Sequence, residues 1–393
     1  MNDNLLLAQR EKISHSNQAL WPLFLATIFM LAVLYLPQPL QPALAAQYGQ
    51  SPASAGLLTT VALVPLAAAP LLYGYLLGNR HPASLLRPAL IALALSCFAF
   101  ASARHFTLLL LIRFAQGALL PILISAILHF LSDAPDNRKT LALYVSCTII
   151  GGFCGRLGTA AFATWSHWQI FPALCGIALL VLAFVIRAPR TDAAHRPQRP
   201  QLADFAILLR SRRVMTLCFI IFAPFSAFVA ILNYLPFIVR QSFPEASTFA
   251  TGMMYSGYLI GAIVSLLAPR ITARFGLKRS FVAASLLFTA SLALLIPESI
   301  VLTFAVLFTL CAAIFLLHSV AIVEVVRASP APRTLTSAFY TTIYYTGSVF
   351  GSFVPGLIFQ RHGKAAFLAA LILAALLGLI AILTLPRPVE TES

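Results

Sequence analysis

Apolar runs long enough to cross a membrane recur along the whole chain, and they constrain its fold more than any other feature. A helix needs about 20 predominantly apolar residues to span about 30 Å of hydrocarbon. We count twelve runs: 20–47, 53–78, 85–103, 106–132, 139–164, 169–187, 214–240, 249–269, 279–296, 299–327, 334–359 and 364–386. The runs do not alternate in polarity as barrel strands would. The sequence therefore predicts an all-α membrane protein with twelve transmembrane helices.

The composition agrees with this class. Of the 393 residues, 60% are hydrophobic and only 9% are charged, whereas about a quarter of the residues in a soluble domain are charged. The six cysteines all fall inside the runs, without metal-ligand spacing, so we interpret them as packing residues. The first run is too long for a cleaved signal peptide, and we expect it to be retained.

The basic residues are distributed unevenly between the two sides of the predicted membrane. If the N-terminus is cytoplasmic, the outer segments contain only Arg104, Arg240, Arg361 and Lys364. Two more arginines lie inside runs, and the rest of the 26 lysines and arginines lie on the inner side. Because cytoplasmic loops carry an excess of these residues, we expect both termini to be cytoplasmic. The same bias accounts for the net charge of +15 without nucleic-acid binding.

The chain divides into two halves with six runs each. We predict an N-terminal six-helix bundle in residues 1–187 and a C-terminal one in residues 214–393. The segment 188–213 is basic and contains prolines, and we interpret it as a cytoplasmic linker. It ends in a short amphipathic stretch that predicts a surface helix. The apolar residues of this stretch are Leu202, Phe205, Leu208 and Leu209.

The two halves share local patterns. The stretch "LYLPQPL" (34–40) in the first run is similar to "NYLPFIV" (233–239) in the seventh. In runs five and eleven, a tyrosine precedes two glycines at matching offsets. These residues are Tyr144, Gly151 and Gly155 in the first half and Tyr340, Gly347 and Gly351 in the second. The pattern favours a duplicated transporter of two pseudo-symmetric bundles, with a binding site between them near the bilayer midplane.

Small residues recur at helical spacing in several runs. Spacing by three or four residues places them on one helix face, where they let two backbones approach closely. They are Gly74 and Gly78, Gly151, Gly155 and Gly158, Gly257 and Gly261, and Gly347 and Gly351. Two interpretations are open: tight packing within a bundle, or a seam on which the halves rock during transport.

Three stretches resemble motifs of the major facilitator superfamily. "RFAQGALLP" (113–121) is similar to the family pattern R-x-x-q-G-x-g through Arg113, Gln116 and Gly117. "PRITARFGLKRS" (269–280) resembles the D-R-x-G-R-K loop and keeps Arg274 and Gly276, with alanine at the position of the acid. "GYLLGNRHPAS" (74–84) is a weaker copy of the same loop.

A fourth stretch points to a branch of the family. "IGGFCGRLGTAA" (150–161) resembles the glycine-rich motif of drug–proton antiporters, with Arg156 where proline is typical. Together with "YLPQPLQPAL" (35–44), it makes the chain most similar to the inner-membrane efflux-type branch that includes the bacterial YnfM-like proteins. The resemblance implies the family fold, with two six-helix bundles, and secondary active transport by alternating access.

The expected function follows from this resemblance. We expect a monomer in the bacterial inner membrane that couples protons to the efflux of amphipathic compounds. The alternative is transport of an organic anion or a sugar-like metabolite, because two arginines lie inside runs that contain few acids. No protease, esterase or phosphate-loop motif is present. We therefore expect no enzymatic activity and no cofactor, and we expect partners limited to a small molecule, protons and the bilayer.

Polar side chains inside the runs are the candidates for substrate binding or coupling. They are Tyr35, Gln38, Arg113, Gln116, Arg156, Asn233, Tyr234, His318, Glu324 and Tyr344. Arginine in hydrocarbon is costly, so Arg113 must face protein or water. It either snorkels or makes a structural hydrogen bond, or it acts in transport, as the matching arginine of the family implies. For Glu324 we expect an ion pair with Arg327.

Arg156 leaves two alternatives. If it faces the cavity together with Arg113, the two charges attract anions. If it turns toward run 249–269 and caps carbonyls there, one cavity charge remains. For conformational change, we select the glycines and the loop arginine of the motifs above. They are Gly74, Gly78, Gly151, Gly155, Gly158, Arg274 and Gly276.

Overall fold

The computed structural model describes residues 20–76, 82–132, 137–186 and 202–385, and these residues are almost entirely helical. The N-terminal half contains α2 (Trp21–Tyr35), η1 (Gln38–Leu40), α3 (Gln41–Gln47), α4 (Pro52–Leu76), α5 (Pro82–Ser102), α6 (Phe106–Ser132), α7 (Asn137–Trp165) and α8 (Ile170–Val185). A short helix, α9 (Leu202–Arg210), comes next. The C-terminal half contains α10 (Arg212–Ser242), α11 (Thr248–Met254), α12 (Gly257–Phe275), α13 (Leu277–Ala293), α14 (Ile300–Ala328) and α15 (Arg333–Leu383).

The number of membrane crossings confirms the twelve predicted helices. Nine helices among the described residues are long and apolar enough to span a bilayer, and Ile170–Val185 is a shorter apolar helix. Leu277–Ala293, which is 17 residues long, covers most of the predicted run 279–296. The last long helix, α15, counts twice because it reverses at Gly363, where φ is 76°. Glycine adopts this left-handed conformation without a steric penalty. The reversal separates the predicted runs 334–359 and 364–386.

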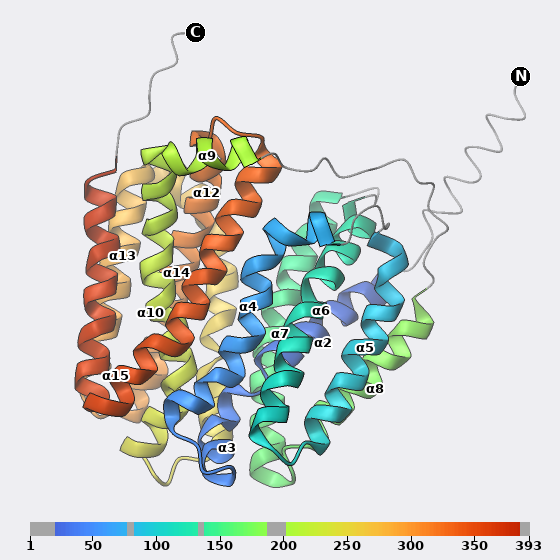
Figure 1. The fold of residues 1–393 in the computed structure, drawn as a ribbon. Coiled ribbons are helices and arrows are strands. Elements are labelled where there is room, and N and C mark those ends of the chain that lie inside the picture. Colours follow the sequence, from blue (N-terminus) through green and yellow to red (C-terminus); the bar gives the residue numbers. More distant parts are fainter. Residues whose placement is uncertain (1–19, 77–81, 133–136, 187–201, 386–393) are drawn as a thin grey trace, which may run out of the picture.

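The helices of the two halves form two bundles that lie side by side (Figure 1). The apolar core forms two clusters, one in each half. The first is built from α2 to α8, and the second is built mainly from α10 to α15. In α9, Leu208 is buried in the second cluster, whereas Ile207 and Leu209 are exposed. This helix therefore lies with one apolar side on the C-terminal bundle.

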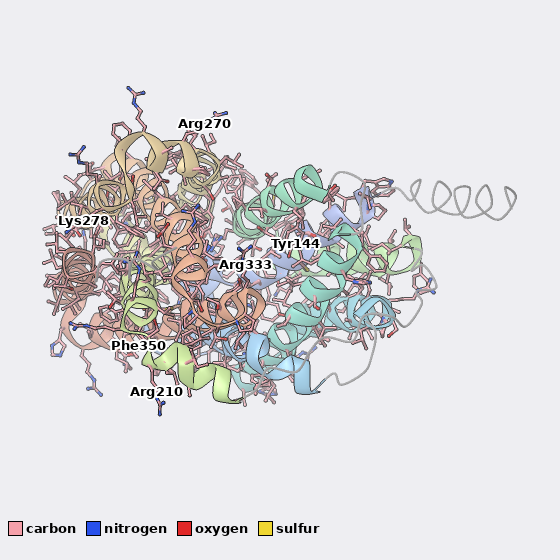
Figure 2. All side chains as sticks on the ribbon, turned by 90° about the horizontal axis from the view of Figure 1, so that it is seen from above. Tyr144, Arg210, Arg270, Lys278, Arg333 and Phe350 are labelled. Carbon is pink, nitrogen blue, oxygen red and sulfur yellow. The ribbon has the colours of Figure 1, made fainter. Side chains whose placement is uncertain are left out.

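The two ends of the molecule differ. α9 lies across one end, and α3 lies at the other (Figure 1); we call these the α9 end and the α3 end. Basic side chains from α9, α12, α13 and α15 gather at the α9 end (Figure 2). They include Arg210, Arg270, Lys278 and Arg333.

Proline interrupts the first crossing. In an α-helix, the carbonyl of Val33 would accept a hydrogen bond from the N–H of residue 37, but Pro37 has no N–H. α2 accordingly ends at Tyr35, and a turn of 3₁₀-helix follows, with Leu40 N–H donating to the Pro37 carbonyl (3.0 Å). The first crossing thus consists of two helical pieces joined by a break.

The predicted glycine faces pack inside the bundles rather than between them. A Cβ at Gly151 or Gly155 would overlap the backbone of α2, and one at Gly158 would overlap the Phe171 ring of α8. The corresponding glycine of α15, Gly351, lies against the backbone of Ser226 on α10. In this state the structure therefore assigns these glycines to tight packing, the first of the two interpretations, and the expected seam lies elsewhere.

The other predicted conformational residues are placed as follows. Gly74 lies near the end of α4, and Gly78 lies outside the described residues. Gly276 joins α12 to α13 with φ of 82°, a conformation that favours glycine. Arg274 lies beside it, and its guanidinium carbon is 5.5 Å from the centroid of the Phe275 ring.

Candidate functional site

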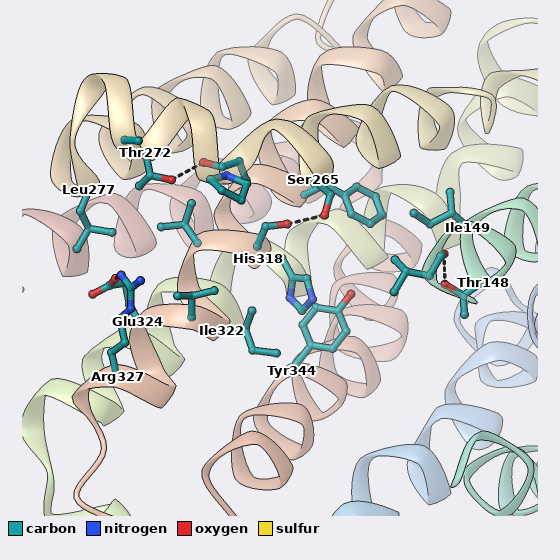
Figure 3. Close-up of a pocket in the computed structure, with 18 of the residues that line it drawn as sticks. Thr148, Ile149, Ser265, Thr272, Leu277, His318, Ile322, Glu324, Arg327 and Tyr344 are labelled. Atoms are coloured by element: carbon teal, nitrogen blue, oxygen red, sulfur yellow. Dashed lines mark hydrogen bonds and ion pairs between the residues drawn. The ribbon is translucent and has the colours of Figure 1, made fainter. Parts of the chain in front are cut away.

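A cavity of about 920 Å³ lies between α7 of the N-terminal bundle and α12, α14 and α15 of the C-terminal bundle (Figure 3). It extends from Phe315, midway along α14, and Tyr344, in the first crossing of α15, to Glu324 and Arg327 at the α9 end. Apolar and aromatic side chains supply most of its wall. Its polar lining residues are Thr148, Ser265, Thr272, His318, Ser319, Glu324, Arg327, Tyr344 and Tyr345.

His318 lies on the cavity wall beside Tyr344, at the end of the cavity away from Glu324. Its Nδ1 lies 2.9 Å from the hydroxyl of Tyr340, and its ring centroid lies 4.5 Å from that of Tyr344 (Figure 3). On α12 and α14, the hydroxyls of Ser265 and Ser319 lie 2.7 Å apart. The arrangement offers a ligand an aromatic surface with a few hydrogen-bonding groups, which suits a molecule that is partly apolar and partly polar.

Glu324 is the carboxylate of the cavity, and two arginines neutralise it. The expected ion pair with Arg327 is present, at 3.1 Å, and Arg213 of α10 lies 3.9 Å from the other carboxylate oxygen. Because both basic partners are close, the carboxylate does not present a free negative charge to a cationic ligand. Among the described residues, no group of three histidine, cysteine, aspartate or glutamate side chains could hold a metal ion.

Arg113 does not line the cavity. It is fully buried in the N-terminal bundle, where its guanidinium donates to the carbonyls of Leu58 (2.9 Å), Val33 (2.8 Å) and Leu34 (2.5 Å) and to Gln116 Oε1 (2.7 Å). The Val33 carbonyl is the one that the proline break deprives of its helical donor. In this state, therefore, Arg113 makes structural hydrogen bonds that join α6 to the break in the first crossing, and it does not snorkel.

Arg156 also lies away from the cavity wall, at the contact between the bundles. Within the N-terminal half, it donates to Gln38 Oε1 (2.6 Å) and to the Gly152 carbonyl (2.8 Å). Across the interface, it donates to the hydroxyl of Tyr258 on α12 (3.3 Å). The arginine thus turns toward the helix pair α11–α12, as the second alternative expected, but there it meets a hydroxyl instead of backbone carbonyls.

Three tyrosine rings enclose the Arg156 guanidinium. Its central carbon lies 4.1 Å from the ring centroid of Tyr35, 4.6 Å from that of Tyr258 and 4.9 Å from that of Tyr255. Cations are attracted to aromatic faces at these distances. We call the guanidinium with these rings and Gln38 the Arg156 cage.

Buried polar side chains connect the bundles toward the α3 end, and we call this group the polar clasp. Gln41 Nε2 donates to Asn233 Oδ1 (2.6 Å), and the hydroxyls of Thr60 and Ser352 lie 2.8 Å apart. The carbonyl of Ser352 accepts from Asn233 Nδ2 (2.9 Å) and from the hydroxyl of Tyr234 (3.1 Å). All of these side chains are buried. They join α3 and α4 to α10 and α15.

Two further contacts support the polar clasp. Gly56 on α4 lies so close to α10 that a Cβ there would overlap the Tyr234 hydroxyl. At the end of α7, the Trp165 ring lies 4.6 Å from the Phe249 ring of α11, and the Phe249 N–H donates to the Thr164 hydroxyl (3.0 Å). The bundles are thus held together at the α3 end, while the cavity separates them toward the α9 end.

The predicted site residues fall into four places. His318, Glu324 and Tyr344 line the cavity. Arg113 and Gln116 lie inside the N-terminal bundle, Tyr35, Gln38 and Arg156 form the Arg156 cage, and Asn233 and Tyr234 belong to the polar clasp. The sequence analysis missed Gln41, Thr60, Ser352 and Tyr258, although each is a polar side chain inside a predicted run.

Comparisons with known proteins agree with this architecture. Residues 23–323 match the family model described as Major Facilitator Superfamily. The chain is 24% identical to the uncharacterized MFS-type transporter YybF of Bacillus subtilis (strain 168), with 90% of each protein covered. It is 25% identical to the inner membrane transport protein YnfM of Escherichia coli (strain K12), with 90% of this chain and 88% of YnfM covered. The solved nucleoside transporter NupG superposes with a TM-score of 0.75 at 15% identity, over 93% of this chain and 98% of NupG.

Proposed function

The chain belongs to the Major Facilitator Superfamily, and from that premise we propose that it exports amphipathic compounds across the bacterial inner membrane in exchange for protons. The family makes it a multi-pass membrane protein and a secondary transporter of a small molecule. The proposal adds the direction, the class of substrate and the coupling ion. The similarity of the chain to YnfM, along most of both proteins, supports the proposal that the chain belongs to the efflux-type branch.

One observation carries the proposal that transport proceeds by alternating access. The cavity lies on the α9 side of the bundle contact, and the polar clasp closes the α3 side. We assign the α9 end to the cytoplasm, because its basic residues follow the rule that cytoplasmic loops carry an excess of lysine and arginine. The structure then corresponds to an inward-facing state, in which a cytoplasmic compound reaches the cavity while the outer side is shut.

The lining of the cavity supports an amphipathic substrate. Phe315 and Tyr344 offer aromatic surface, and Ser265, Ser319 and His318 offer hydrogen bonds. For proton coupling we propose His318, because an imidazole changes its charge near neutral pH unless its surroundings shift it. The titratable and charged groups around it are Tyr340 and Tyr344 of α15, with Cys218 of α10 near Tyr340, and Glu324 with Arg327 farther along α14.

An organic anion is the second candidate substrate, and one observation favours it. Among the described residues, no ion pair involves Arg156, so its buried positive charge is balanced only by neutral acceptors and aromatic rings. An uncompensated charge at the contact between the bundles favours a ligand of opposite sign.

A reversible cross-link across the polar clasp tests the alternating-access part of the proposal. In a cysteine-free background, Thr60→Cys and Ser352→Cys replace two hydroxyls that lie 2.8 Å apart, so a disulfide needs only a small adjustment. We expect oxidation to stop transport in proteoliposomes and a reducing agent to restore it. The single-cysteine variants serve as controls. Full transport by the oxidised, cross-linked protein would refute the proposal that this contact opens.

The direction and the coupling are tested in the same vesicles. Under a proton gradient of either orientation, we expect amphipathic compounds to move against the proton flow and to drive a measurable pH change. Movement of substrate without a pH change would exclude proton coupling, and movement in the same direction as protons would exclude exchange.

A further inference from the structure

The Arg156 cage combines a buried charge with partners from two parts of the molecule that separate in the proposed alternating access. Gln38 and Tyr35 belong to the first crossing, and Gly152 lies on the same helix as the arginine. Tyr255 and Tyr258 belong to the C-terminal bundle. A movement that opens the α3 end therefore divides this cage.

The tyrosines on the far side are fixed to their own bundle. The Tyr255 hydroxyl donates to the Leu232 carbonyl of α10 (2.8 Å), and the Tyr258 ring packs against Phe228 and Phe315, with centroids 5.9 Å and 5.6 Å away. These contacts hold both rings on the C-terminal bundle. When that bundle moves, the rings leave the guanidinium and do not follow it.

Arg156 makes its shorter hydrogen bonds to partners in the N-terminal bundle. Its hydrogen bonds to Gln38 Oε1 and the Gly152 carbonyl measure 2.6 Å and 2.8 Å, against 3.3 Å to the Tyr258 hydroxyl. Gly152 also leaves the room that the group needs, since a Cβ there would lie 3.3 Å from both Arg156 Nη1 and the Tyr35 ring. The guanidinium therefore stays with the N-terminal bundle and loses the faces of Tyr255 and Tyr258.

From this geometry we infer that Arg156 becomes a binding site for an organic carboxylate when the α3 end opens. The inference rests on the proposed alternating access but not on the direction of transport. Once the two tyrosines have left, the Nη2 group has no partner on the C-terminal side, and no acid pairs with the charge among the described residues. An anion entering from the α3 end supplies the missing counter-charge.

The chemical class of the ligand follows from the groups that remain. The guanidinium presents a planar pair of N–H donors, which matches the two oxygens of a carboxylate. Tyr35 stays beside it as an aromatic wall, so the site favours a carboxylate attached to an apolar or aromatic body. The single positive charge of Arg156 is balanced by a single negative charge, so an amphipathic monocarboxylate is the best match.

The carboxylate and the pair of Tyr255 and Tyr258 compete for the same face of the Arg156 guanidinium. The closed state is stabilised by Tyr255 and Tyr258 on that face, and the open state is stabilised by the anion. A ligand that binds one state shifts the population toward it. An amphipathic carboxylate therefore holds the α3 end open, and the tyrosine pair acts as an internal substitute for it when the ligand is absent.

Benzoate serves as the probe, and benzyl alcohol serves as its neutral match. In the purified full-length protein carrying Thr60→Cys and Ser352→Cys without other cysteines, the rate of disulfide formation reports the closed state. We expect benzoate to slow the reaction by about fivefold or more, the lower end of typical coupling between two sites, and benzyl alcohol to leave it unchanged. With Arg156→Gln added, the effect of benzoate should disappear.

Two further measurements keep the inference open to refutation. Tyr258→Phe removes the hydrogen bond that Arg156 makes with the C-terminal bundle. It should therefore lower the benzoate concentration at which disulfide formation is slowed by half of the full effect. Calorimetric titration of benzoate, independent of the disulfide, should show binding that Arg156→Gln abolishes. The inference fails if benzoate neither slows disulfide formation nor binds. It also fails if the Arg156→Gln variant responds to benzoate like the parent protein, or if the Tyr258→Phe variant needs the same or a higher concentration of benzoate. A disulfide that forms without blocking transport refutes instead the proposed alternating access.

Discussion

Gln41 on α3 donates a 2.6 Å hydrogen bond to Asn233 on α10, a residue 192 positions away in the sequence. The contact joins the two bundles inside a buried polar group, where a hydrogen bond lost without replacement leaves unsatisfied atoms. Within the described residues, the other amide atom of this glutamine, Oε1, has no hydrogen-bond partner. The polar clasp is therefore incompletely satisfied, which suits a contact that breaks in the proposed transport cycle.

Replacing Asn233 should weaken the closed α3 end. Asn233→Ala removes the bonds to Gln41 and to the Ser352 carbonyl, and polar contacts of this kind contribute about 1 kcal/mol in membrane proteins, or about a fivefold shift in population. We expect a cysteine at position 60 to react faster with a water-soluble thiol reagent in this variant. Ser265→Ala, which removes a hydroxyl pair within the C-terminal bundle, is the control. Equal reactivity in the two variants would contradict this role of Asn233.

Adding a methyl group at Gly56 should open the same contact by steric pressure. Gly56→Ala places a Cβ against the Tyr234 hydroxyl and within 3.1 Å of Asn233 Nδ2, both from the other bundle. Separation of the bundles relieves the overlap, so we expect faster thiol labelling at position 60 with little loss of melting temperature.

Gly351→Ala provides the matched comparison, because its Cβ would overlap the Ser226 backbone inside one bundle. Separation of the bundles does not relieve that overlap. We expect this variant to lose melting temperature without a change in labelling. The reverse pattern for the two glycines would show that Gly56 is an ordinary packing position.

Substituting Arg113 should lower stability and transport together. Arg113→Ala leaves the carbonyls of Val33 and Leu34 without their donor, and a buried unsatisfied carbonyl costs about 1–3 kcal/mol. Arg113→Lys should recover part of the melting temperature, because an ammonium group donates hydrogen bonds but cannot reproduce the planar fork. The measurements are melting temperature in detergent and transport at equal membrane abundance. An alanine variant that is stable and fully active would contradict the expected contributions of Arg113 to stability and to transport.

His318 should carry the coupling between substrate and protons. His318→Gln keeps a hydrogen-bonding side chain but removes the titration, so we expect substrate to bind and to exchange across the membrane without a pH change. Tyr340→Phe removes the partner of Nδ1 and should shift the pH dependence of transport without abolishing it. Thr309→Ala on the same helix is the control, because its hydroxyl lies 2.7 Å from that of Ser291 and does not line the cavity. An unaltered pH signal in the glutamine variant would assign coupling to another group.

The sequence predicted the helices well because bilayer thickness sets the length of an apolar run. It also predicted the ion pair of Glu324 and Arg327, because residues three apart on a helix are neighbours whatever surrounds them. The number of crossings follows from the lengths of the apolar runs, and this local contact follows from helical periodicity. Both are confirmed.

The neighbours of a helix face could not be predicted in the same way. The spacing of Gly151 and Gly155 identifies one face of α7, but only the packing shows that α2 of the same bundle covers it. Arg156 is a similar case. Its charge requires contact with protein or water, yet nothing in its spacing selects the rings of Tyr35, Tyr255 and Tyr258.

The break at Pro37 divides the first crossing into two segments that have different partners. α3 is seven residues long and carries Gln41 of the polar clasp, and the preceding turn carries Gln38 of the Arg156 cage. On the other side of the break, Arg113 fixes the end of α2 to α6. The break thus divides two roles along one crossing: α2 is anchored inside the N-terminal bundle, and the short segment after the break reaches the C-terminal bundle through Gln41.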